Sequence, residues 1–195
     1  MRPVRALAAA ASCAVAACAG LSNRPEPGAY AVDPTHTSVT FEVAHFGTST
    51  SRGRFERAQG EVQLGESGNG GRVEIRIATA SVSTGVPALD SRLRGADFLD
   101  SEAHPTATFS ADGLAFSGKA VSEVVGQLTL RGKTLPLTLK ASHFNCYVSP
   151  LLLRQVCGGD FEATLQPSRW GVAGGLPIGI ADEVRLLVQV EAIRQ

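Results

Sequence analysis

Histidines are the residues of this sequence best suited to proton transfer or metal binding, and there are four: His36, His45, His104 and His143. None stands three or four residues from another on an expected helix, so their spacing predicts no metal site and no metal cofactor. A histidine bonded to a neighbour near the rim of a barrel is the commoner case. The alternative is that His36 or His45 binds the polar end of a ligand.

Catalytic motifs are otherwise scarce. Residues 113–119 match the start of a phosphate-binding loop, but Ala120 replaces the required Ser or Thr, and a hairpin rather than a helix is expected there. The sequence has no G-x-S-x-G elbow and no H-E-x-x-H pair. Its 18 Lys and Arg balance 18 Asp and Glu, which disfavours nucleic acid as a partner. These observations predict a binding protein rather than an enzyme.

The N-terminus has the pattern of a bacterial export signal. Arg2 and Arg5 precede an uncharged run of small and apolar residues that is too short to span a bilayer. Val15–Cys18 resembles a lipobox, which predicts removal of residues 1–17 and acylation of Cys18 as a membrane anchor. The alternative is conventional cleavage after a small residue, with Cys18 incidental. We therefore expect a periplasmic protein with a flexible tether at residues 18–28 and one domain at residues 29–195.

An exported chain reaches an oxidising compartment, where two nearby cysteines usually join. We predict a disulfide between Cys146 and Cys157, which would stabilise the fold by about 3 kcal/mol in the chain-entropy model. The alternative, a redox or metal pair, lacks the C-x-x-C spacing. The apolar run 151–153 between them is expected to pack on the core, while covering a barrel mouth or contacting a partner are the alternatives.

Short alternating segments between glycine and proline turns predict an all-β domain. The clearest strand is residues 37–46, followed by a Gly-, Ser- and Thr-rich stretch, residues 47–53, that we expect to form a turn at the rim. Residues 87–95 are the one convincing helix, packed at or near an end of the barrel. The other strands are expected at residues 29–33, 54–64, 72–82, 105–111 in a hairpin with 114–116, 123–131 in a hairpin with 135–144, 161–165 and 183–194. About eight antiparallel strands would close a barrel around an elongated ligand.

Several blocks, in order, resemble the YceI-like family of exported bacterial proteins: YAVDPTHTSVTFEVAHFGTSTSRGRF, ASVSTG, SRLRGADFLDSEAHPTATFSA and VVGQLTLRGKTLPLTL. The resemblance covers about residues 30–193 and implies a lipocalin-like antiparallel barrel. It also implies binding of a long isoprenoid lipid, of the quinone or polyprenyl type, or of a similar amphiphile, as a carrier or reservoir. The family offers no catalytic motif to transfer.

The implied site combines an apolar cavity with a polar mouth. Burial of several isoprene units contributes on the order of ten kcal/mol before the cost of ordering the chain. His36 and His45 are the expected contacts to the head group. The inward apolar residues expected to bind the chain are Val39, Phe41, Val43, Phe55, Ile75, Ile77, Phe98, Phe109, Leu128, Leu130, Leu137, Leu139, Phe161, Leu186 and Val188.

Two other functions compete with a lipid carrier. One is a hydrolase or redox enzyme acting on a lipophilic substrate through His and Asp at the barrel mouth. The other is a structural or interaction module whose barrel is filled by its own side chains. The alternation of a strand shows which side a residue faces and leaves its depth open, so it does not separate these readings. A homodimer is compatible with all three.

Overall fold

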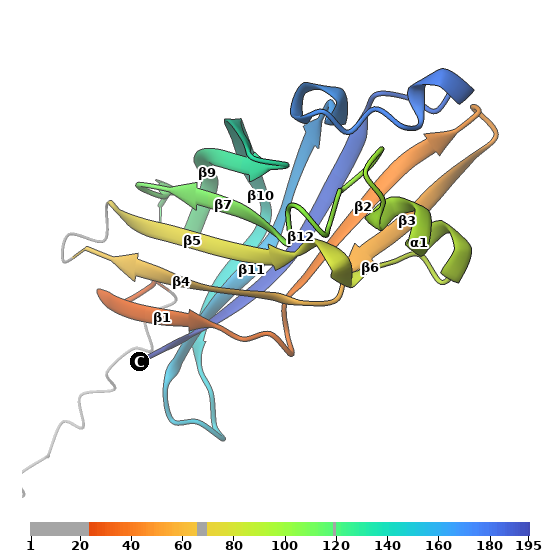
Figure 1. Cartoon of the computed structure of the whole chain (residues 1–195). Coiled ribbons are helices and arrows are strands. Elements are labelled where there is room, and N and C mark those ends of the chain that lie inside the picture. Colours follow the sequence, from red (N-terminus) through yellow and green to blue (C-terminus); the bar gives the residue numbers. More distant parts are fainter. Residues whose placement is uncertain (1–23, 66–69, 119) are drawn as a thin grey trace, which may run out of the picture.

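The computed structural model describes residues 24–65, 70–118 and 120–195, and these form one antiparallel sheet that closes on itself (Figure 1). Eight strands make the closed barrel because β1 pairs with both β4 and β12. In their order around the barrel they are β1 (Gly28–Val32), β4 (Ala58–Leu64), β5 (Gly71–Ala78), β7 (Thr106–Ala111), β9 (Ala120–Leu130), β10 (Lys133–Val148), β11 (Gln155–Leu165) and β12 (Val184–Arg194). The predicted antiparallel barrel of about eight strands is confirmed.

Strand β12 also carries a second, open part of the sheet. Its first residues, 184–189, pair with β2 (Ser38–His45), whereas its last residues, 192–194, pair with β1. Strand β2 continues the sheet to β3 (Ser49–Phe55) and to the short β6 (Val82–Ser83). A short strand β8 (Ala115–Ser117) lies beside β9. We call β2, β3 and β6 the extension, and it projects beyond the barrel in Figure 1.

The helical segments lie toward the extension. The helix α1 (Pro87–Arg94) starts at a proline and ends just before Gly95, as predicted, and follows β6. The 3-10 turns are η1 (Thr79–Ser81), η2 (Pro167–Trp170) and η3 (Leu176–Ile178). Figure 1 places η2 and η3 at the opposite end of the molecule from the start of β1 and the β10–β11 loop. No helix among the described residues is long and apolar enough to cross a bilayer.

The structure differs from the sequence-based prediction at two of the expected turns. Residues 49–53, expected to be part of a rim turn, belong to β3, because each pairs with a residue of β2 and the reversal needs only the residues around Gly47. The expected strand at residues 54–64 is therefore split between β3 and β4. Strand β8 pairs with β9 instead of forming a hairpin with β7, since Asp112 and Gly113 lead the chain across to the next strand.

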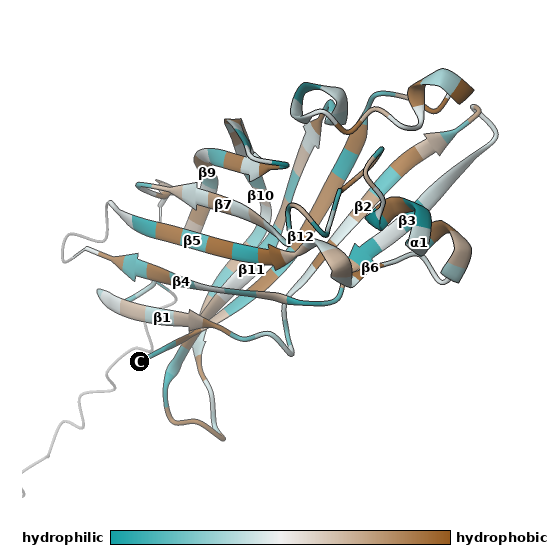
Figure 2. Cartoon of the chain, viewed as in Figure 1, coloured by the Kyte–Doolittle hydropathy of each residue, from teal (hydrophilic) through white to brown (hydrophobic). Residues whose placement is uncertain are grey.

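The barrel interior is packed at one end. Figure 2 shows apolar and polar residues alternating along the strands, as required when one face of a sheet is buried. Trp170, only 1% exposed, lies in the main core, and its indole N–H donates to the Leu128 carbonyl at 2.9 Å. Leu137 and Leu165 are buried in the same cluster. We call this the filled end of the barrel.

Candidate ligand-binding cavity

A cavity of about 100 Å³ occupies the other half of the barrel. All eight closing strands contribute to its wall, together with the first part of β2, so it lies inside the barrel rather than between the barrel and a loop. Its walls are almost entirely apolar side chains. Such a surface can hold hydrocarbon through burial, but it offers few groups for acid-base chemistry.

Six of the residues predicted to bind the chain line this cavity. They come from β2, β5, β7, β10, β11 and β12, and they are Val39, Ile75, Phe109, Leu139, Phe161 and Val188. Five of the six come from strands of the closed barrel, in the neighbouring pair β5 and β7 and in the run β10, β11 and β12. Their contact with a ligand remains a prediction.

The other nine predicted chain-binding residues are not in the cavity wall. Leu128 and Leu137 are buried in the main core, where Leu130 and Leu186 also pack. Ile77 and Phe55 pack in a smaller cluster beside Val39. Phe41 packs at a tilt against Phe55, with ring centroids 5.9 Å apart. Val43 pairs with Val184 near the end of β2. The Phe98 ring lies 5.7 Å from the Arg92 guanidinium. The four leucines thus fill space where the sequence suggested that they enclose it, while Phe41, Val43 and Phe98 lie outside the cavity wall.

The sequence did not identify most of the remaining wall. The additional lining residues are Pro25, Tyr30, Thr37, Val62, Leu64, Val73, Leu114, Val121, Val124, Phe144, Cys157, Gly158, Val190 and Ala192. Many of them alternate with polar neighbours in β4, β5, β9 and β12, so the period-2 pattern carried the signal. The missing information was how far along the barrel axis each strand begins.

The two histidines expected at the head group lie far apart. His36 precedes β2 and His45 ends it, so the length of this strand, about 25 Å, separates them. Neither lines the cavity. His36 is exposed and its Nδ1 lies 2.9 Å from the Asp33 carboxylate, while the His45 and Phe46 rings meet edge to face with centroids 4.6 Å apart. The structure therefore does not bring them together around one ligand group.

The electrostatics around His36 are local to its turn. Hydrogen bonds from Thr35 and His36 lower the pKa of the Asp33 carboxyl to about 2, and that carboxylate in turn raises the pKa of His36. Among the described residues, no group of three His, Cys, Asp or Glu side chains is placed to hold a metal ion. The turn before β2 is thus held by an ion pair between Asp33 and His36 at the surface.

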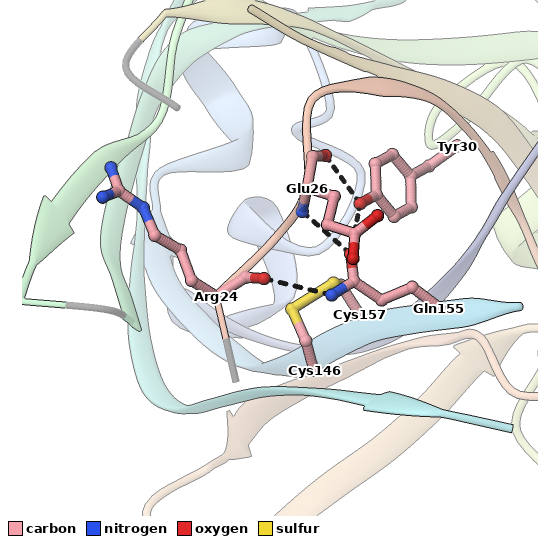
Figure 3. The surroundings of a disulfide bond; sticks show 6 residues. All are labelled: Arg24, Glu26, Tyr30, Cys146, Gln155 and Cys157. Atoms are coloured by element: carbon pink, nitrogen blue, oxygen red, sulfur yellow. Dashed lines mark hydrogen bonds between the residues drawn. A yellow bond between two sulfur atoms is a disulfide. The ribbon is translucent and has the colours of Figure 1, made fainter. Parts of the chain in front are cut away.

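The chain that precedes β1 closes the cavity end of the barrel (Figure 3). Residues 24–27, which we call the strap, were expected to belong to a free tether, but the structure places them against the barrel. Pro25 is buried and borders the cavity. The Glu26 side chain extends outward to Arg194, with 2.9 Å between carboxylate and guanidinium. Arg24 lies over the Phe116 ring at 5.7 Å.

One buried glutamine holds the strap. The Gln155 amide oxygen accepts a hydrogen bond from the Glu26 N–H at 2.8 Å, and its amide N–H donates to the Arg24 carbonyl at 3.0 Å. The Tyr30 hydroxyl lies 2.6 Å from the Gln155 oxygen and 2.7 Å from the Glu26 carbonyl. Because it has one proton, it donates to these two acceptors in a shared or alternating way. Burial raises the pKa of Tyr30, so this donor keeps its proton at neutral pH.

The predicted disulfide is present directly behind this glutamine. Cys146 and Cys157 face each other across β10 and β11 and are joined through their sulfur atoms. Both are buried, and Cys157 also lines the cavity. The cross-link therefore joins β10 to β11 just below the hairpin tip, in the part of the wall that borders the cavity. Cys18, the predicted acylation site, and the export signal at residues 1–17 lie outside the described residues.

Comparison with known proteins agrees with this architecture. A family model described as a YceI-like domain matches residues 30–192. The chain belongs to the YceI-like family. A UPF0312 protein of Pseudomonas aeruginosa (strain LESB58) is 34% identical over 162 residues, covering 82% of this chain and 83% of that protein. A UPF0312 protein of Vibrio cholerae (strain ATCC 39541) is 32% identical over 124 residues, covering 62% and 66%.

Solved structures share the fold of this YceI-like chain at lower identity. BcnA of Burkholderia cenocepacia superposes with a TM-score of 0.64 at 21% identity, covering 82% of this chain and 98% of that one. A polyisoprenoid-binding domain from Saccharophagus degradans gives 0.65 at 17% identity, with 85% and 98% covered. The YceI protein of Campylobacter jejuni gives 0.63 at 19% identity, with 78% and 90% covered. The lipocalin-like barrel predicted from the sequence is thus confirmed.

Proposed function

We propose that this YceI-like protein is an exported, lipid-anchored carrier or reservoir for a long isoprenoid lipid of the quinone or polyprenyl type. The observation that carries the proposal is the apolar cavity walled by all eight strands of the closed barrel. Transfer of hydrocarbon into such a wall contributes about 0.8 kcal/mol for each buried CH₂, so a chain of isoprene units can bind through its tail alone. The polyisoprenoid-binding relative from Saccharophagus degradans supports this ligand class.

The size of the cavity constrains how the ligand binds. Sites for small molecules typically measure about 300–1,000 Å³, and this cavity has about 100 Å³. In this conformation it accommodates a segment of a long chain rather than the whole of it. The filled end is blocked by Trp170 and its neighbours, whereas the strap closes the other end with a few hydrogen bonds. The rest of the ligand would therefore occupy space made by displacing the strap.

An enzymatic function receives less support from the geometry. The proposed ligand space lacks the two histidines expected at its mouth, and its wall is made almost wholly of carbon. A nucleophile needs a base within hydrogen-bonding reach. The lining offers the Tyr30 hydroxyl, which is already bonded within the strap, and Thr37. We accordingly propose binding, with no turnover and no cofactor beyond the lipid itself.

Mass spectrometry of an organic extract tests the proposal. The protein is purified gently from its bacterial host, and we expect an apolar compound with an isoprenoid mass pattern at a stoichiometric amount. The matched variants are Val188→Phe, which places a larger side chain in the cavity, and Val125→Phe, which changes an exposed position on β9. The first should lose the lipid and the second should retain it. An extract of the unaltered protein with no lipid above that of a control protein would overturn the proposal.

A further inference from the structure

The tip of the β10–β11 hairpin presents three leucines to solvent. Leu151, Leu152 and Leu153 are 91%, 49% and 81% exposed. The tip is nevertheless ordered, because the Ser149 N–H donates to the Arg154 carbonyl at 2.9 Å and the Leu153 N–H donates to the Ser149 carbonyl at 2.8 Å. The expectation that this run packs on the core was therefore wrong. The turn projects beyond the barrel wall, where no core is available.

Such a display is unusual for a free surface. Apolar residues scattered singly over a surface are normal, but a contiguous group held outward on a turn marks a contact with a partner or a membrane. Tyr147 and Val148 extend the apolar surface down the same hairpin, at 46% and 43% exposure. Figure 2 shows the apolar colour at this tip. The sequence from residue 147 to residue 157 contains no acidic residue, and Arg154 is its one charged group.

The position of the tip relative to the N-terminus suggests what covers it. Gln155, two residues beyond Leu153, binds the Arg24 carbonyl, so the chain arrives from its N-terminal side at the base of this hairpin. Cys18 stands six residues before Arg24 in the sequence. Six extended residues span at most about 20 Å. An acyl anchor on Cys18 would hold this end of the barrel close to the bilayer.

We propose that the leucine tip, residues 151–153, inserts into the interface of a lipid bilayer beside the N-terminal anchor. The leucines would enter the boundary between head groups and acyl chains, and the exposed Arg154 would meet lipid phosphates. An anchor at one point of a flexible segment tethers the protein without orienting it, and a second membrane contact fixes the orientation. The tip supplies that second contact.

Docking in this way extends the proposed function because it orients the cavity. Pro25 and Cys157 border the cavity at the same end of the barrel as the tip. An isoprenoid could then pass between the bilayer and the cavity through a short apolar path, without crossing open water. The exposed apolar residues of η3, Leu176 and Ile178, lie at the opposite end and out of reach of the anchor.

A tryptophan placed at the tip tests the docking. Trp170 is the only native tryptophan and is 1% exposed, so it gives a constant background. Leu151→Trp adds a reporter at the tip, and Ile178→Trp adds one at a similarly apolar exposed position at the far end. The exported, processed protein is reconstituted with vesicles of phosphatidylethanolamine and phosphatidylglycerol, with or without lipids brominated on the acyl chain. We expect a blue-shifted, bromine-quenched emission for Leu151→Trp alone.

A second variant shows whether the leucines themselves drive insertion. Adding Leu152→Asp and Leu153→Asp to Leu151→Trp should abolish both the blue shift and the quenching, while circular dichroism confirms that the barrel is folded. Emission from Leu151→Trp that vesicles leave unchanged would overturn the proposal. So would quenching confined to Ile178→Trp, which would assign the membrane contact to the opposite end.

The test also separates the membrane from a protein partner. A dimer in lipid-free buffer that the same two aspartates dissociate would assign the tip to a second copy of the chain, and would overturn membrane docking. Failure here is distinct from failure of the lipid-carrier function, because the extraction experiment reports the bound lipid whatever the tip contacts. Conversely, a tip that inserts into vesicles supports docking even if the extract holds no isoprenoid.

Discussion

Replacing Gln155 should open the strap and speed the uptake of apolar ligands. In Gln155→Leu the side chain keeps a similar size but loses its hydrogen bonds to the Glu26 N–H and the Arg24 carbonyl, at 2.8 and 3.0 Å. The Tyr30 hydroxyl retains the Glu26 carbonyl as an acceptor. An intramolecular hydrogen bond contributes about 1 kcal/mol net, so the closed strap loses about 2 kcal/mol. The fraction of molecules with an open strap should then rise about 30-fold.

Stopped-flow fluorescence with an environment-sensitive naphthylamine probe measures this effect. If the probe takes the place of the strap, it binds only molecules whose strap is open, so its association rate and its affinity should both rise by about 30-fold while its dissociation rate changes little. A change confined to the association rate distinguishes competition with the strap from an altered binding wall, which would change the dissociation rate. The matched control is Gln127→Leu, at an exposed position on β9, which should leave both rates unchanged.

Two results would refute this reasoning. An unchanged association rate in Gln155→Leu would show that ligands reach the cavity by another path. A lower affinity with an unchanged association rate would show that Gln155 acts as part of the binding wall. Urea unfolding at equilibrium provides the stability of both variants, so a general loosening of the barrel can be separated from movement of the strap.

Three further predictions concern the wall, the hairpin and the surface turn. In Gly126→Ala the added Cβ would lie 2.5 Å from the Ser110 carbonyl oxygen and 2.6 Å from the Phe109 ring, so both the β7 backbone and the ring should shift, lowering probe capacity and costing about 1–3 kcal/mol of stability in a urea titration. Reduction of the disulfide, which closes a loop with a sequence separation of 11, should lower the free energy of unfolding by about 3 kcal/mol, with unchanged stability contradicting the estimate. Asp33→Asn should lower the pKa of His36 toward its ordinary value in an NMR titration, because Asp33 raises it. The raised pKa of His36 stabilises the fold at acid pH, and this stabilisation is lost as the pH rises through the pKa of the folded state. The lowered pKa of Asp33 acts in the opposite direction, because its stabilisation is lost as the pH falls from 3.8 toward about 2.

The sequence predicted the barrel because its signals are local and repeated. Strand β12 alternates over most of its length, with Leu187 and Ile193 as exceptions, and α1 begins at Pro87 and ends before Gly95, so both were located to within a few residues. The reversal after His45 was misjudged for a physical reason. Gly, Ser and Thr are typical of turns, but residues 49–53 lie opposite β2, and this pairing outweighed their weak local preference.

The cavity was harder to predict than the barrel. Alternation placed Leu137 and Leu139 on the same face of one strand. Leu139 nevertheless lines the cavity, whereas Leu137 is buried in the core. The difference depends on where Trp170 packs, and a tryptophan in a turn-rich segment does not specify which residues lie beneath it. The strap was missed for a related reason. Its two prolines and charged residues are typical of linkers, and the contact depends on Gln155, which is 129 residues away from Glu26.

The strap would also couple binding of the proposed ligand to its release, because a ligand larger than the cavity must displace the strap. The sheet closes around the barrel through continuous pairing, and the filled end is packed around Trp170, so widening either would break many contacts at once. The strap, by contrast, is held by a few side-chain contacts, from Gln155, Tyr30 and Arg194, and Pro25 occupies a place at the edge of the cavity. The isoprenoid that we propose as the ligand would therefore gain space with the fewest broken contacts by displacing Pro25. Ligand and docked strap would then compete, so any force that draws residues 24–27 toward the bilayer favours the loaded state, and return of the strap favours release.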